Sequence, residues 1–317
     1  TGMSGLPDGS VKIGALALKN PVMPASGTFG YAQEYAPFMD LNRLGAIVVK
    51  TITLKPRVGS FPHRSTEVAS GLLASIGQQN VGMEHFLEDK LPFFQSIETP
   101  LIVNIGGERI EEYVSLARSL DQQARVQGVE LNVSCPNVSK GGMHFGIDPE
   151  GLRDLVSQVR QATGKTLIVK LTPMVTDLRP FAEICQRKGA DAVSLINAPI
   201  GMAVDIKTLR SKLGRNLTGG LTGPAIKPLA LYCVWRVCSA VDLPVIGIGG
   251  ITSLEDALEF IIAGACAVQV GTSNFINPRI TLDIIEGLEK YLVDNHLKTV
   301  QELRGTLAEQ VAKVRNQ

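Results

Sequence analysis

The chain has 317 residues, of which 44% are hydrophobic and 19% charged, and its formal net charge is +1 at pH 7. This length suits one α/β barrel with a large apolar core, and the near-neutral charge gives no reason to expect a nucleic-acid-binding or membrane-binding surface. We find no run of about 18 apolar residues and no charged-then-apolar leader, so the sequence predicts neither a membrane span nor a signal peptide.

Eight short runs rich in β-branched residues recur along the chain. They are nearly continuously apolar rather than alternating, which is typical of parallel strands buried on both faces. In chain order they are 21–26, 46–51, 101–106, 129–134, 167–172, 192–197, 244–250 and 267–272. Amphipathic segments such as 111–127, 149–163 and 254–263 separate most of them. This pattern predicts an α/β fold, a single (β/α)₈ TIM barrel, and disfavours the alternative of a doubly wound sheet.

The remaining segments fit the same fold. Residues 11–18 are typical of a hairpin that closes the barrel floor. Two connections are long, namely 52–100 after the second strand and 198–243 after the sixth, and loops of this length in a compact domain usually carry function. Because no linker, repeat or low-complexity tract interrupts the chain, we expect residues 1–317 to form one domain.

The cysteines indicate the compartment. They are Cys135, Cys185, Cys233, Cys238 and Cys266, and no two have C-x-x-C spacing. We therefore expect neither a metal site nor an iron–sulfur cluster within this chain. An odd number of cysteines without a signal peptide is typical of free thiols in a reducing cytoplasm.

Polar side chains stand at the carboxyl ends of six predicted strands. In chain order they are Ser26, Lys50 with Thr51, Asn104, Asn132, Lys170 and Asn197. In this fold such strand ends face the active site, and burying a polar group without a partner costs several kcal/mol. We therefore expect the set to line a polar pocket that a ligand fills. For any single asparagine, the alternative is a hydrogen bond to backbone at the barrel mouth.

Glycines stand at the ends of the last two predicted strands, in Gly249-Gly250 and in Gly271-Thr272. Loops at these two places in a barrel commonly bind a phosphate through bare backbone amides. Gly223, in the segment GGLTGP, offers a further close approach of backbone to ligand. The sequence therefore predicts a ligand that carries a phosphate.

A phosphate site beside a strand-end lysine suggests flavin mononucleotide (FMN). Lys170 could lie at the N1/O2 edge of the flavin ring, where its charge would stabilise the anionic reduced form. Pyridoxal phosphate, held by a lysine Schiff base, is an alternative, but no strand end offers a carboxylate for its pyridine nitrogen. A sugar-phosphate isomerase is another, but no strand end supplies the Glu or His base that it needs.

Cys135 lies just past the fourth strand, in the segment ELNVSCPN, where we expect the catalytic rim. Pro136 stiffens this loop, and Asn132 and Asn137 bracket the sulfur with donors and acceptors. A thiol has a reference pKa of about 8.5, which nearby lysines lower. Cys135 is therefore a candidate general base, whereas the other four cysteines fit buried apolar positions.

At these residues the chain resembles the class 1 dihydroorotate dehydrogenases, and most of all their 1B branch. The resemblance spans about residues 11–310 and rests on NPVMPASGTFG, VVKTIT, ELNVSCPNV, VKLTP, GGLTGPAIKP, GIGGI and VGTSNF. It implies an FMN-dependent oxidation of dihydroorotate to orotate in pyrimidine biosynthesis. Cys135 would take a proton from C5, and hydride would pass from C6 to flavin N5. Class 2 relatives have a serine base and a membrane-binding N-terminal helix, and the sequence shows neither.

The resemblance also implies partners. Members of the 1B branch pair with a second subunit that carries FAD and a [2Fe–2S] cluster and hands electrons to NAD. We therefore expect a homodimer, or a heterotetramer with such an electron-transfer subunit. This would explain the lack of cluster cysteines in the chain.

Site residues follow from the same resemblance. Positions that match flavin contacts are Ser26, Lys50, Thr51, Asn104, Asn132, Lys170, Ile196, Gly223, Gly249, Gly250, Gly271 and Thr272. Positions that match substrate contacts are Lys50, Ile76, Gly77, Asn132, Asn137 and Asn197.

Three positions depart from the family pattern. Ala74 stands where an asparagine is usual, Gln78 where a leucine is usual, and Ala198 where a threonine or serine is usual. Two side-chain hydrogen bonds to orotate are thereby missing, worth about 1 kcal/mol to a neutral group and about 1.5–3 kcal/mol to a charged one. Ser75 or Gln78 could replace them.

Two other functions stay open. If no other side chain replaces these hydrogen bonds, the chain is a paralogue that acts by the same mechanism on another dihydropyrimidine-like or cyclic enamide ring. A non-catalytic FMN scaffold or electron-transfer subunit of a larger complex is the remaining hypothesis.

Overall fold

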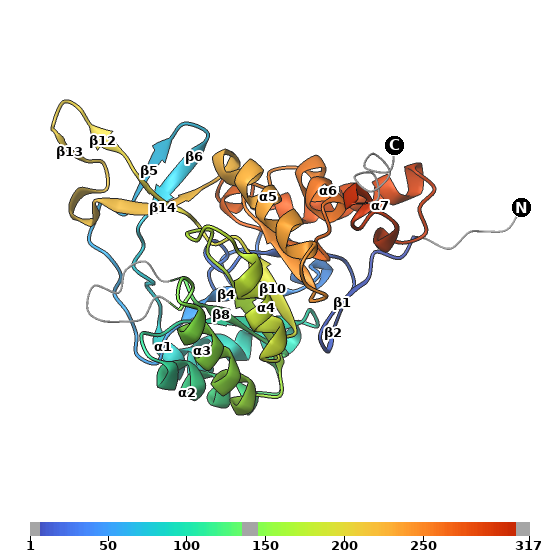
Figure 1. The fold of residues 1–317 in the computed structure, drawn as a ribbon, viewed down its shortest axis with the longest axis horizontal. Coiled ribbons are helices and arrows are strands. Elements are labelled where there is room, and N and C mark those ends of the chain that lie inside the picture. Colours follow the sequence, from blue (N-terminus) through green and yellow to red (C-terminus); the bar gives the residue numbers. More distant parts are fainter. Residues whose placement is uncertain (1–6, 135–144, 309–317) are drawn as a thin grey trace, which may run out of the picture.

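The barrel sheet is the centre of the computed structural model, which describes residues 7–134 and 145–308. Eight parallel strands pair in the order β3-β16-β15-β10-β9-β8-β7-β4 (Figure 1). They are β3 (Val22–Pro24), β4 (Ile47–Ile52), β7 (Leu101–Ile105), β8 (Gly128–Asn132), β9 (Thr166–Lys170), β10 (Ala192–Leu195), β15 (Val245–Ile248) and β16 (Ala267–Val270). Gly45 N donates to Val22 O at 3.0 Å, so the start of β4 lies beside β3 and the sheet nearly closes. The predicted TIM barrel and its eight strands are confirmed.

Helices surround this sheet. They are α2 (Ile110–Asp121), α3 (Pro149–Ala162), α4 (Arg179–Arg187), α5 (Lys227–Cys238), α6 (Leu254–Ile262) and α7 (Ile280–Asp294). A capping side chain fixes the start of α3, where the Asp148 carboxylate accepts from Glu150 N and Gly151 N. The helix expected over 111–127 ends earlier, because Gln127 N donates to Leu101 O at 3.0 Å and the chain already extends toward β8.

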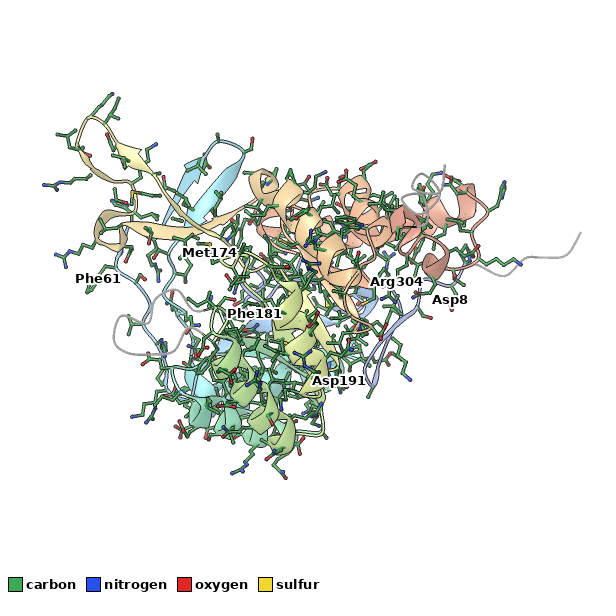
Figure 2. All side chains as sticks on the ribbon, in the orientation of Figure 1. Asp8, Phe61, Met174, Phe181, Asp191 and Arg304 are labelled. Atoms are coloured by element: carbon green, nitrogen blue, oxygen red, sulfur yellow. The ribbon has the colours of Figure 1, made fainter. Side chains whose placement is uncertain are left out.

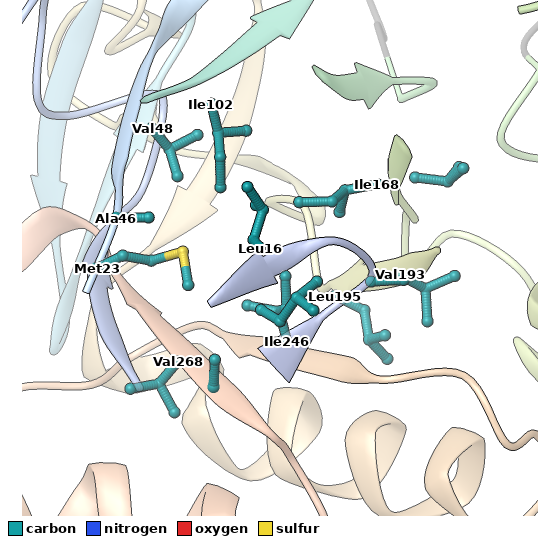
Figure 3. Packing of buried hydrophobic residues seen from close by; sticks show 14 of the residues in the cluster. Leu16, Met23, Ala46, Val48, Ile102, Ile168, Val193, Leu195, Ile246 and Val268 are labelled. Atoms are coloured by element: carbon teal, nitrogen blue, oxygen red, sulfur yellow. The ribbon is translucent and has the colours of Figure 1, made fainter. Parts of the chain in front are cut away.

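The predicted floor hairpin is present as β1 (Val11–Ile13) and β2 (Leu16–Leu18), which are antiparallel. Ala15 N donates to Thr166 Oγ1 at 3.2 Å, which ties the hairpin to the amino end of β9. The buried Leu16 side chain points among Ile102, Ile168 and Ile246 inside the barrel (Figure 3). Apolar side chains therefore fill this end of the barrel, and the opposite end is left for a ligand.

The two long connections form a second sheet that the sequence did not predict. Its order is β11-β14-β6-β5, all antiparallel, and β14 and β6 come from different connections. The strands are β5 (Ser65–Val68), β6 (Gly71–Ala74), β11 (Ile200–Met202) and β14 (Thr218–Thr222), and a two-stranded arm of β12 (Val204–Asp205) and β13 (Arg210–Ser211) extends from them. This sheet and arm project from one side of the barrel (Figure 1).

Short helices lie in these connections and elsewhere along the chain. They are α1 (Gly82–His85), η1 (Leu41–Arg43), η2 (Phe86–Lys90), η3 (Leu91–Ser96), η4 (Gly214–Asn216), η5 (Pro224–Ile226), η6 (Thr272–Phe275) and η7 (Val300–Glu302). Phe61 stands at the outer side of the projection with 68% exposure (Figure 2). The Arg215 guanidinium lies 5.5 Å from the centre of its ring, a cation–π contact between the two long connections.

Candidate functional site

A cavity of about 720 Å³ lies at the carboxyl ends of the barrel strands, with the second sheet as part of its wall. Residues 72 and 74 of β6 and residues 220 and 222 of β14 line it on that side. Most of the predicted site residues meet there: Lys50, Ile76, Gly77, Asn132, Lys170, Ile196, Asn197, Gly223, Gly249, Gly250, Gly271 and Thr272. The volume is within the usual range for a small-molecule or cofactor site.

Three predicted flavin contacts lie behind the wall of this cavity rather than in it. Lys170 Nζ donates to Ser26 Oγ at 3.5 Å, and Thr51 Oγ1 donates to Asn104 Oδ1 at 2.6 Å. Ser26, Thr51 and Asn104 are all buried, so here they support side chains that reach the cavity. Cys135 and Asn137 lie outside the described residues, and their predicted roles stay predictions.

Glu130 is a buried acid that the sequence analysis did not single out. Its carboxylate accepts from Asn104 Nδ2 at 2.6 Å, from Ser194 Oγ at 2.8 Å and from Gln269 Nε2 at 2.9 Å. The side chain is 0% exposed and lies inside the barrel below the cavity. The available signal was an acid in the middle of an otherwise apolar strand.

Two lysines give the cavity a positive character. Lys170 is only 6% exposed, and over residues 7–134 and 145–308 its ammonium has no carboxylate partner. Burial and the nearby Arg64 guanidinium lower the pKa of Lys50, and the Glu34 carboxylate partly opposes them. A buried positive charge is costly unless an anion balances it, so the cavity suits an anionic ligand.

The glycines after β14 and β15 bring backbone to the cavity edge. Gly223, Gly249 and Gly250 have φ of +91°, +130° and +73°, which side chains rarely tolerate. A Cβ on Gly250 would lie 2.7 Å from Lys227 Cβ, and one on Gly249 would lie 2.8 Å from Ala230 Cβ. Bare backbone is therefore required here, as in a phosphate-binding loop.

A dihydroorotate dehydrogenase family model matches residues 9–292. The chain belongs to the dihydroorotate dehydrogenase family. It is 52% identical over 299 residues to the dihydroorotate dehydrogenase B (NAD(+)) catalytic subunit of Thermodesulfovibrio yellowstonii, covering 94% of this chain and 98% of that one. It is 51% identical over 303 residues to the protein of the same name from Geotalea uraniireducens, covering 96% and 99%.

Membership in the dihydroorotate dehydrogenase family confirms the resemblance seen in the sequence. It also confirms the expected enzyme class, an oxidoreductase that acts on CH–CH bonds in a flavin-dependent family. Within the described ranges, no helix is both long and apolar enough to cross a membrane. In the same part of the chain, no group of three or more His, Cys, Asp or Glu side chains is placed to hold a metal ion.

The three departures from the dihydroorotate dehydrogenase pattern all lie at the cavity, since Ala74, Gln78 and Ala198 line it. Gln78 has φ of +51°, and its buried amide has no hydrogen-bond partner among the residues described. The changed positions therefore concern the cavity rather than scattered parts of the fold.

Proposed function

We propose that this protein oxidises dihydroorotate to orotate with FMN bound in the cavity, as a step of pyrimidine biosynthesis. The observation that carries the proposal is the convergence of the buried Lys170, the half-buried Lys50 and the strained glycines on one cavity in a chain of this family. The lysines balance anionic groups, and the glycines leave room for a phosphate. Residues 1–317 would then form one FMN-binding domain.

The described residues fit FMN at two places. Gly223, Gly249, Gly250, Gly271 and Thr272 would hold the phosphate, and Lys170 would lie beside the ring. FMN, when bound, supplies at N5 an acceptor for the hydride that leaves C6 of dihydroorotate. Substrate binding and removal of the C5 proton are left to the protein's own side chains.

Lys50, Asn132 and Asn197 would hold the carboxylate and carbonyl groups of dihydroorotate. Their ammonium and amide N–H groups donate, and those ligand groups accept. Ile76, Gly77 and Asn137 would complete the substrate pocket. Cys135 would take the C5 proton as the general base. The two lost bonds of dihydroorotate, C5–H and C6–H, are thereby accounted for as a proton and a hydride.

We propose that the protein acts in the cytoplasm, as a catalytic subunit. The relatives' names support the subunit role, because each is a catalytic subunit of an enzyme named for NAD(+). We expect a homodimer, or a heterotetramer with a subunit that carries FAD and a [2Fe–2S] cluster. That subunit would take electrons from the FMN and pass them onward.

The test is to mix the purified flavoprotein with dihydroorotate in the absence of oxygen and to follow the flavin absorption band at about 450 nm. Rapid bleaching is the expected result, because the lysines and asparagines of the cavity hold the substrate against the flavin. Dithionite serves as the control that the flavin is reducible. A flavin that dithionite bleaches and dihydroorotate does not would contradict the proposal.

Ala74 and Ala198 favour one alternative, a paralogue with another cyclic substrate. A site that lacks hydrogen-bond partners for one ring discriminates against that ring by orders of magnitude. The same anaerobic experiment with dihydrouracil separates the two functions. Faster bleaching by dihydrouracil than by dihydroorotate would favour the paralogue.

Orotate binding is expected to weaken with rising pH earlier than an ordinary lysine would allow. Burial and the Arg64 guanidinium hold the pKa of Lys50 below its usual value, so its positive form is lost at a lower pH than that of an ordinary lysine. Orotate affinity measured between about pH 7 and 10.5 gives the midpoint. Arg64→Gln should move this midpoint to higher pH and Glu34→Gln to lower pH. Unchanged midpoints in both variants would contradict the role of Lys50.

A further inference from the structure

A chain of hydrogen bonds links the buried Glu130 to the cavity. Thr51 Oγ1 donates to Asn104 Oδ1 at 2.6 Å, and Asn132 Nδ2 donates to Thr51 Oγ1 at 3.4 Å. Asn197 Nδ2 then donates to Asn132 Oδ1 at 3.0 Å. Asn104 is bonded to Glu130 below, and Asn132 and Asn197 line the cavity above. This chain of hydrogen bonds therefore runs from the barrel interior to the cavity.

A carboxylate at its lower end gives this chain one direction. A carboxylate only accepts hydrogen bonds, so Asn104 turns its NH₂ group to Glu130 and its oxygen to Thr51. Thr51 then uses its single proton on Asn104 and has only lone pairs left for Asn132. Asn132 must turn its NH₂ group to Thr51 and its oxygen to Asn197. Asn104 and Thr51 are therefore oriented from Glu130 upward, and the backbone N–H groups of Ser134 and Ala198 favour the same orientation of Asn132 and Asn197.

The result is a fixed set of donors at the cavity. Asn132 Oδ1 accepts from Asn197 Nδ2 and from Ser134 N at 3.4 Å, and Asn197 Oδ1 accepts from Ala198 N at 2.9 Å. Each NH₂ group has two protons and uses one within the chain, so the second protons remain for a ligand. Both asparagines therefore present N–H donors to the cavity, which matches a ring with carbonyl groups and a carboxylate.

We propose that Glu130 is a positioning residue that, through Asn104 and Thr51, holds the amides of Asn132 and Asn197 as donors toward the substrate. This inference rests on the proposed function, since it takes orotate as the ligand. Barrel interiors are usually filled by branched apolar side chains, and a buried charge can often be replaced by an apolar group without loss of stability. Glu130 fixes the donor-to-acceptor direction of the hydrogen bonds in this chain, which an apolar side chain would not do.

The test compares orotate binding by the FMN-loaded Glu130→Met and Ser194→Ala variants, using calorimetry. A methionine side chain has a similar shape to glutamate but offers Asn104 no carboxylate, so the Asn104 amide can turn over and the direction of the hydrogen bond at Thr51 is no longer set from below. We expect Glu130→Met to raise the orotate dissociation constant at least tenfold and to raise KM for dihydroorotate more than it lowers kcat. Ser194→Ala removes a donor to the same carboxylate on the side away from the chain, and we expect a change of less than twofold.

Thr51 variants test whether Glu130 acts on orotate binding through the chain of hydrogen bonds. Thr51→Val should weaken orotate binding like Glu130→Met, and the double variant should be no weaker than either single one. Thr51→Ser keeps a hydroxyl and should bind within about threefold of the parent protein. Additive effects of the two changes, or no rescue by serine, would mean that the residues act separately and would overturn the proposal.

The outcomes separate this inference from the proposed function. A parent protein that binds no orotate contradicts both. A parent that binds orotate, together with a Glu130→Met variant that binds it equally well, overturns the positioning role alone. If Glu130→Met does not fold, Asn104→Leu breaks the same chain and leaves Glu130 bonded to Ser194 and Gln269. Orotate binding unchanged in that variant would overturn the proposal as well.

Discussion

Lys170→Met is expected to give a folded protein whose flavin is reduced by dihydroorotate about 10²–10³-fold more slowly. The Lys170 ammonium is buried at the end of β9, and within the described part of the chain its hydrogen bond to Ser26 Oγ is long and no carboxylate pairs with it. Its charge is therefore free to stabilise negative charge that develops in the cavity. Methionine keeps much of the side-chain volume and removes that charge.

Two measurements check this result beyond the rate. The midpoint potential of the bound flavin should fall, because the reduced anionic form loses its neighbouring positive charge. The ligand-free protein should become no less stable, because an unpaired buried charge has been removed. Lys165→Met is the matched control, since Lys165 directly precedes β9 at the opposite end from Lys170 and its Nζ donates to Gln123 O at 3.1 Å. A normal potential and rate in Lys170→Met would contradict this role.

The barrel could be predicted because its strands carry their own signal. Runs such as LIVNI in β7 and TLIVK in β9 are buried on both faces, and parallel strands of that kind read as continuous apolar segments. The second sheet has no such signal. In β5 exposed and half-buried residues alternate, and β14 is TGGLT, with two glycines in five residues. Its pairing with β6 joins residues far apart in the chain, which local patterns do not report.

The cavity could be predicted in outline because strand ends converge in a barrel. Lys50, Asn132, Lys170 and Asn197 meet there as the polar pattern indicated. The pattern did not distinguish side chains that reach the cavity from those behind it. Asn104 ends a strand like the others, but its amide is used by Glu130 and Thr51. Which polar group meets a ligand depends on its partners in space.

Cys135→Ser is expected to keep FMN bound and to slow flavin reduction by dihydroorotate by about 10²–10⁴-fold, the usual contribution of a general base. A thiol with a reference pKa of about 8.5 supplies thiolate near neutral pH, and the cavity lysines favour that form. A serine hydroxyl does not ionise in this range. The residue lies outside the described part of the chain, so the expectation rests on its place after β8 and on this chemistry.

Stopped-flow bleaching of the FMN-loaded variants measures the effect, with Cys238→Ser as the control. Burial raises the pKa of Cys238 to about 12, so its thiol carries no charge at neutral pH and its replacement should leave the rate unchanged. A Cys135→Ser protein that bleaches as fast as the parent would place the base elsewhere. If that variant also supports normal electron flow to the physiological acceptor, the non-catalytic scaffold becomes the better account. Loss of bleaching with FMN still bound excludes the scaffold, because a scaffold does not need a base at C5.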